Sequence, residues 1–170
     1  NDKNFSANIH RALTRLKSIF ITLNHTEGIV YKNANNFYHP FAIKNGDAYD
    51  PVDEHSFQIQ IGSKIIPEYP VTSVTEAMSQ LRKCVGNRPL HLYGRWYRSH
   101  KYIIGLDLEK ISGAGFTGTS TKSGDQLTIN FKDCDAVGTG FANSVPTRMF
   151  CALNYDAVLN IQSEGIQILD

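Results

Sequence analysis

A chain of 170 residues, 41% of them hydrophobic, is long enough to bury one hydrophobic core. Its 17 basic and 16 acidic residues leave a formal charge of +1, which excludes the strongly basic composition of a protein that coats nucleic acid. The three cysteines are widely spaced and do not form a disulfide framework, so we expect reduced, buried thiols in a cytosolic or nuclear setting. No apolar run of about 18 residues is present, so we expect no membrane span.

Period-two alternation of apolar and polar residues dominates the chain and predicts strands that bury one face. The run at 56–61 shows it most clearly, with phenylalanine and isoleucines alternating with serine and glutamines. Gly62 and Ser63 then offer a turn, after which we expect a short strand that Pro67 ends. In chain order, we predict strands at residues 19–23, 56–61, 64–66, 104–109, 127–131, 149–155, 158–161 and 166–168.

One segment breaks this alternation. Ser73 and Glu76 form a capping box, in which each side chain can satisfy a backbone donor of the other. Apolar residues follow at helical spacing, and Gly86 supplies a left-handed stop. The spacing predicts a short amphipathic helix over 74–85, lying on an edge or end of a sheet.

Long loops rich in turn-forming residues separate the predicted strands, at 32–53, 113–125 and 133–145. No repeat, low-complexity linker or change in composition divides the chain. We therefore predict an all-β fold, with a single antiparallel β-sandwich over residues 1–170. A jelly roll is the version that we favour, because its connections cross the sheet edges and require such loops.

The sequence predicts no catalytic, cofactor-binding or metal site. Asp107 and Glu109 share a strand face and could do acid–base work, but their apolar neighbours favour the wet side of a sheet. The six histidines have no metal-ligand spacing, and no cysteine lies in a recognisable catalytic motif. The pattern Gly-x-Gly-x-x-Gly at 113–118 matches a dinucleotide-binding fingerprint, but residues 119–124 are poor helix formers, so we interpret it as a loop.

One cluster combines aromatic and basic side chains in a way that could support binding. Such a cluster can form a protein interface, stack on nucleic acid or simply belong to a strand with an exposed basic face. We regard these residues as a possible protein interface: Tyr93, Arg95, Trp96, Tyr97 and Arg98.

Three groups of segments resemble a known family. The first group comprises QIQIGSK at 58–64, PEYPV at 67–71 and the helical residues 76–83. The second comprises IGLDLEK at 104–110, GAGFTG at 113–118 and KSGD at 122–125. The third comprises VPTR at 145–148, YDAVL at 155–159 and EGIQILD at 164–170. Together, over about residues 55–170, they resemble the C-terminal part of the major capsid proteins of Polinton (Maverick) elements and adintovirus-like double-stranded DNA viruses.

The resemblance implies a structural virion protein, assembled in the host nucleus or cytoplasm, that has no catalytic residues and no cofactor. That family folds as two jelly rolls per chain and forms trimers. The 170 residues hold one jelly roll and begin without methionine, so we expect either half of a larger double-jelly-roll chain or a single-jelly-roll relative such as a vertex protein. The implied partners are further copies of the chain, as a trimer when the full chain is present, and other capsid proteins. We expect neither membrane binding nor direct nucleic-acid binding.

Two other functions stay open at this stage. A non-catalytic β-sandwich could recognise carbohydrate or protein through its loops, with Trp96, Tyr97 and the aromatic residues of 37–41 as contacts. An enzyme on a β-sandwich or a cupin-like barrel is the third alternative, weakened by the lack of paired histidines with a carboxylate at ligand spacing.

Overall fold

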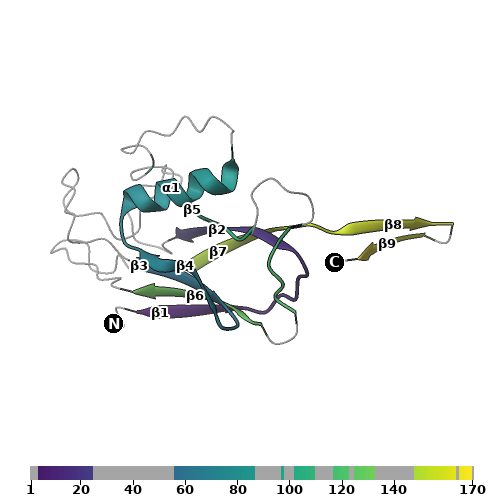
Figure 1. The fold of residues 1–170 in the computed structure, drawn as a ribbon, viewed down its shortest axis with the longest axis horizontal. Coiled ribbons are helices and arrows are strands. Elements are labelled where there is room, and N and C mark those ends of the chain that lie inside the picture. Colours follow the sequence, from purple (N-terminus) through teal and green to yellow (C-terminus); the bar gives the residue numbers. More distant parts are fainter. Residues whose placement is uncertain are drawn as a thin grey trace.

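Two antiparallel β-sheets pack face to face in the computed structural model. It describes residues 4–24, 56–86, 97, 102–109, 117–122, 125–132, 148–163 and 165–169. Among the described residues, one complete helix lies outside the sheets, and a C-terminal hairpin projects beyond them (Figure 1). The predicted all-β sandwich with one short helix is therefore confirmed.

The first sheet has four strands, in the order β1 (Phe5–Ile9), β6 (Leu127–Lys132), β3 (Ser56–Ile61) and β4 (Lys64–Val71). The second has three, in the order β5 (Ile104–Asp107), β2 (Leu16–Asn24) and β7 (Arg148–Tyr155). The projecting hairpin consists of β8 (Val158–Gln162) and β9 (Gly165–Leu169). The helix, α1 (Val74–Val85), follows β4.

The core lies between the sheets, where the alternating apolar residues point inward. In the first sheet Phe57 pairs with Phe131 and Ile59 with Ile129, and all four side chains are buried. In the second sheet Ile19 pairs with Leu106, so that isoleucine and leucine side chains cover the first sheet from the other side. Burial of these alternating faces is the main force that holds the sheets together.

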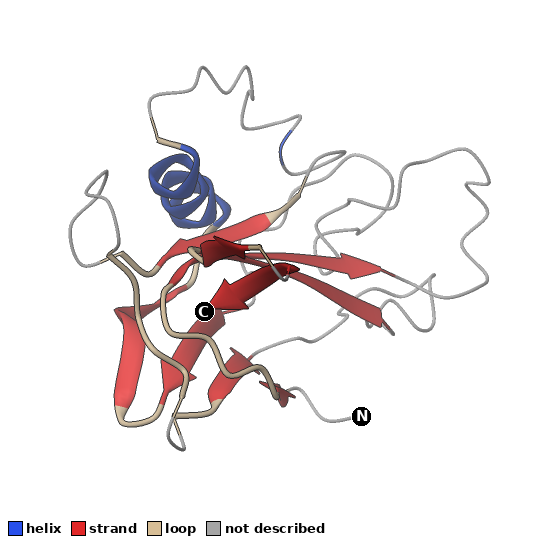
Figure 2. Cartoon of the chain, turned by 90° about the vertical axis from the view of Figure 1, so that its right-hand side faces the viewer, coloured by secondary structure: helices blue, strands red, loops and turns tan. Residues whose placement is uncertain are grey.

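Helix α1 forms where the capping residues predict it. The Ser73 side chain accepts a hydrogen bond from the Glu76 N–H at 3.1 Å, while the Glu76 carboxylate accepts one from the Thr72 N–H at 2.9 Å. At the other end, the Gly86 N–H donates to Arg82 and Lys83 carbonyls from a backbone with φ of 67°. Ala77 and Leu81 are the buried residues of the helix. The helix covers the second sheet on one side only (Figure 2).

The helix lies directly on the edge strand β5, because Gly105 has no side chain to separate them. A Cβ atom at Gly105 would lie 2.7 Å from Leu81 Cδ1 and 3.3 Å from Cys84 Sγ. The expected placement of the helix on a sheet edge is confirmed, and this glycine explains how close the approach is.

Three strand predictions need correction. Strand β1 was not predicted, although Phe5 stacks on Phe131 with ring centroids 4.7 Å apart. Strand β4 continues to Val71 through Pro67 instead of ending there, because an edge strand tolerates residues without an N–H. Strand β5 stops at Asp107, two residues before the predicted end, since the Asp107 carboxylate accepts a hydrogen bond from the Glu109 N–H at 3.0 Å.

Candidate assembly surface

The C-terminal hairpin carries the largest group of exposed apolar side chains among the described residues. In its register Leu159 lies opposite Ile168 and Ile161 opposite Ile166, so all four side chains share one face. Their exposed fractions are 60%, 68%, 76% and 68% respectively. We call these four residues the arm face, and the hairpin the arm. The strands predicted at 158–161 and 166–168 are confirmed, but the expectation that alternating strands bury one face fails here, because the arm stands clear of both sheets (Figure 1).

The opposite face of the arm is more polar than the arm face, although Val158 and Leu169 form one apolar pair on it near the root. Asn160 lies opposite Gln167 on that face, and Gln162 lies opposite Gly165 at the turn. Residues 158–163 and 165–169 include no charged residue and no proline. Natural strand edges are protected against pairing by such residues, so the composition of the arm leaves it open to association.

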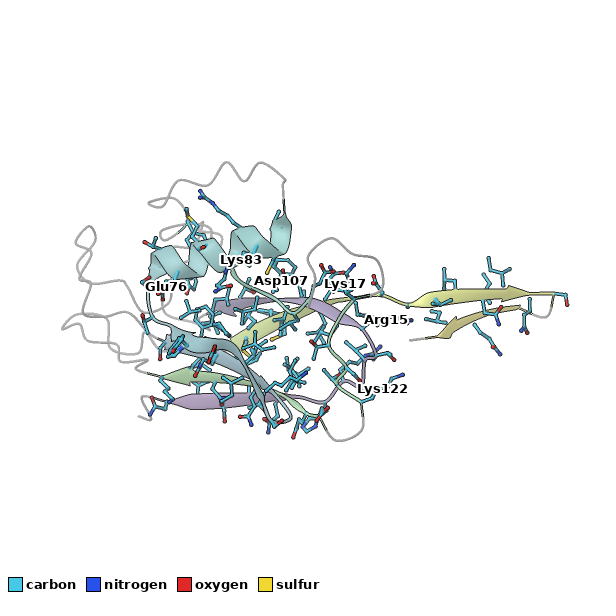
Figure 3. The ribbon with its side chains drawn as sticks, in the orientation of Figure 1. Arg15, Lys17, Glu76, Lys83, Asp107 and Lys122 are labelled. Carbon is cyan, nitrogen blue, oxygen red and sulfur yellow. The ribbon has the colours of Figure 1, made fainter. Side chains whose placement is uncertain are left out.

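The root of the arm is fixed to the body by a small polar cluster (Figure 3). The Asp156 N–H donates to the Arg15 carbonyl at 3.1 Å, just before β2. The Lys17 ammonium contacts Glu109 at 2.9 Å and Asp156 at 3.4 Å, and the hydrogen bond that it donates to Glu109 raises the pKa of Lys17. Glu109 is therefore part of a structural ion pair. The sequence suggested that it shares a strand face with Asp107, but the strand ends at Asp107.

The strand that leads into the arm forms an incompletely covered flank of the sandwich. Met149, Cys151, Leu153 and Tyr155 of β7 pack against the core but are only partly buried, whereas Ile19 and Ile21 on the neighbouring strand are fully buried. Within the described residues, β7 pairs with β2 along one edge and with no strand along the other. We call the four β7 residues the open flank. Phe150, on the outer face of the same strand, is 56% exposed.

The predicted interface cluster is only partly visible. Tyr93, Arg95, Trp96 and Arg98 lie outside the described residues. Tyr97 is fully buried, its hydroxyl donates to the Ile103 carbonyl at 2.8 Å, and its ring packs on Tyr102 at 5.2 Å. Burial raises the pKa of its phenol, and its backbone is helical, not extended. The structure therefore gives Tyr97 a packing role in the core.

The two described cysteines are poor nucleophiles. Burial, reinforced by the nearby Asp107 carboxylate, raises the pKa of Cys84 to about 12. Burial also raises the pKa of Cys151, on the open flank, to about 11. Both thiols are protonated at neutral pH, and only the thiolate attacks an electrophile. Cys134 lies outside the described residues.

A small cavity of about 250 Å³ lies near the turn between β3 and β4. It is smaller than a typical ligand pocket, and hydroxyl groups form much of its wall. Its lining residues are Thr14, Ile61, Ser63, Lys64, Gly118, Thr119, Ser120 and Asp125. Thr119 forms an isolated bridge with Leu16, and residues 117–122 are not helical, so the helix that a dinucleotide-binding fingerprint at 113–118 would need does not follow it.

Across the described part of the chain, no three histidine, cysteine or acidic side chains are grouped closely enough to hold a metal ion. The described helices include none with the length and apolar character needed to cross a bilayer. The arm face and the open flank are therefore the features in the described structure that most need an explanation. The chain matches no protein-family model, no curated protein and no solved structure.

Proposed function

We propose that the chain is a jelly-roll subunit of a viral capsid, and that its function is to assemble a shell through lateral contacts with other subunits. The observation that carries the proposal is the order of strands in the two sheets. An eight-stranded jelly roll has one sheet in the order second, seventh, fourth, fifth and another in the order first, eighth, third, sixth.

The seven strands β1 to β7 follow this order if β1 is taken as the second strand of a jelly roll, β2 as the third, and so on to β7 as the eighth. The order β1-β6-β3-β4 corresponds to second, seventh, fourth and fifth. The order β5-β2-β7 corresponds to sixth, third and eighth. The position of the first strand, beside β7, is vacant among the described residues, and this is the edge where the core is only partly covered.

Surface properties also favour assembly over catalysis. The arm face exposes four large aliphatic side chains that a solitary protein has no reason to keep in water. A shell subunit works through many weak contacts that symmetry multiplies, and it needs strand edges and projecting segments instead of a deep pocket. The resemblance of residues 55–170 to the capsid proteins of Polinton elements and adintovirus-like viruses points the same way, and implies a trimer when the full chain is present.

The proposal is tested by light scattering after size-exclusion chromatography, over a wide range of protein concentration. We expect concentration-dependent association of this chain, and trimers or larger particles from the full-length gene product. Electron microscopy of the same samples would reveal closed particles. A strictly monomeric state of both proteins at all concentrations would contradict the proposal.

The hydroxyl-lined cavity favours a second candidate, a binding module for carbohydrate. At the cavity, the Lys64 ammonium could donate hydrogen bonds to a small sugar and the Asp125 carboxylate could accept them. No aromatic side chain lines the cavity, which weakens this candidate because sugar sites commonly use an aromatic platform. A glycan array distinguishes the two: a binding module would retain specific glycans and lose them on Asp125→Ala, whereas a shell subunit would retain none.

A further inference from the structure

We propose that the arm face of one copy of this chain binds the open flank of a second copy. The inference rests on the proposed function and names the surfaces through which assembly would occur. The arm face is Leu159, Ile161, Ile166 and Ile168, and the open flank is Met149, Cys151, Leu153 and Tyr155.

The arm needs a partner because it cannot be stable on its own. A two-stranded hairpin is marginally stable in water unless another surface covers one of its faces. The exposed fraction of every arm-face side chain is at least 60%, so the described part of this chain does not provide that cover. A second surface must therefore bury the face if the arm is to stay folded.

The arm cannot turn back onto its own flank. Strand β8 follows β7 after Asp156 and Ala157, and it continues in the direction of β7 away from the sheets (Figure 1). The Asp156 N–H bond to Arg15 and the Lys17 ion pairs hold this junction in place, with Lys17 and Arg15 at the root of the arm (Figure 3). A fixed root presents the arm in one direction, which lowers the entropic cost of docking on another molecule.

The open flank has the chemistry that the arm face requires. After Arg148, strand β7 carries no charge and no proline, and its four core-facing side chains are partly exposed. Its free edge can accept backbone hydrogen bonds, as in other cases of strand addition. The opposite edge of the molecule is unsuitable, because β4 carries Lys64, Pro67, Glu68 and Pro70 along its length.

The expected contact is small, and this determines how assembly would behave. An arm face offers apolar surface on the order of a few hundred Å². Stable interfaces bury about 1,000 Å² or more in total, so one arm on one flank reaches only the lower limit. Each copy also keeps one free arm and one free flank, which is the geometry of a ring or a chain. Association should therefore be weak between two copies and strengthen when a ring or shell closes.

The test uses paired charges that preserve the hairpin. In the arm variant, Ile161→Lys with Ile166→Glu places a salt bridge across the arm face, since these residues lie opposite each other. Its matched control, Asn160→Lys with Gln167→Glu, places the same charges on the polar face. The flank variant is Cys151→Lys, and its control is Ala152→Lys on the outer face of the same strand.

Sedimentation velocity of each protein, alone and mixed, gives the readout, with thermal unfolding to confirm that each variant is folded. We expect the arm and flank variants each to associate at least about 30-fold more weakly than the wild type. Both control variants should associate as strongly as the wild type. The arm variant keeps an intact flank and the flank variant an intact arm. A mixture of the two should therefore form a 1:1 dimer and stop there.

Three results would overturn the inference. They are an arm variant that associates as the wild type does, a mixture that stays monomeric, and a flank variant that still dimerises alone, which would mean that arms bind arms. If the wild type associates in any of these cases, the assembly function stands and only the arm-to-flank contact fails. If the wild type and the full-length gene product both remain monomeric, the proposed function fails as well.

Discussion

The two edges of the sandwich differ in how well they are protected against pairing with another strand. On one side, β4 carries two prolines and two charged residues, and the adjoining part of the second sheet lies under helix α1. On the other side, the ribbon from Met149 to Leu169 presents uncharged strands, a partly covered core and the arm face. We call these the closed side and the open side.

The difference separates residues that stabilise the monomer from residues that are available to a partner. On the closed side, the prolines and charged residues of β4 hinder further pairing, and helix α1 buries apolar surface within the chain, although Ile65 and Tyr69 of β4 stay exposed. On the open side, the same alternation of apolar residues is present, but the described residues bury it only partly on β7 and leave it exposed on the arm. Mutations should therefore have large effects on monomer stability on the closed side and small effects on the open side.

The largest expected contrast comes from one substitution made at two isoleucines. Ile129→Ala removes a fully buried side chain between the sheets and should lower the free energy of unfolding by about 2–5 kcal/mol. Ile161→Ala removes a side chain that is 76% exposed on the arm and should change it by less than about 0.5 kcal/mol. Urea unfolding of dilute, monomeric protein measures both. An equal loss at the two positions would show that the arm is packed within the monomer.

A row of three residues across the second sheet gives the next contrast. Phe20 pairs with Gly105 on one side and with Ala152 on the other. Gly105→Val places atoms where Leu81 already lies and should destabilise the protein by about 1–3 kcal/mol. Ala152→Val, in the same row but exposed, should be neutral or slightly stabilising, because valine favours strands. If Ala152→Val costs as much, a layer not seen here covers the outer face of β7.

Helix α1 allows a similar test at a smaller magnitude. Ser73→Ala removes the acceptor of the Glu76 N–H and should cost about 1 kcal/mol in thermal or urea unfolding. Ser79→Ala, on the exposed face of the same helix, should be neutral or stabilising because alanine has the higher helix propensity. A neutral Ser73→Ala would mean that packing on β5, and not the cap, fixes where the helix begins.

The last expected effect, absent at neutral pH, is alkaline sensitivity from the two thiols. Folding raises the pKa of Cys84 from 9.0 to about 12 and that of Cys151 from 9.0 to about 11. Above pH 9.0 the unfolded chain releases these protons while the folded chain keeps them, so stability should fall as pH rises. Cys84→Ala and Cys151→Ala should each remove part of this dependence. Unfolding curves of both variants and the wild type between pH 8 and 11 measure it; slopes equal to that of the wild type would contradict the assignment.

The sequence predicts where most strands lie on both sides, but it does not predict that the apolar face of the arm stays exposed. The alternation at 56–61 and 127–131 predicts strands β3 and β6, and Ser73 with Glu76 predicts the start of α1. These signals are local, because a capping bond spans three residues and strand alternation spans two. The arm was visible as two short strands on either side of Glu164 and Gly165, and the lack of charge within the strands themselves was a signal that they were not ordinary surface.

By itself, the sequence determined the helix and the position of every strand except β1, since backbone preference and alternation act over a few neighbouring residues. Only the tertiary structure decided what covers each apolar face: the second sheet for Ile59, the core for Tyr97, and no described residue for the arm face. It also decided that β4 runs through Pro67, because that strand lies at an edge. Alternation shows that one face of a strand is apolar, but what covers that face depends on strands distant in the sequence.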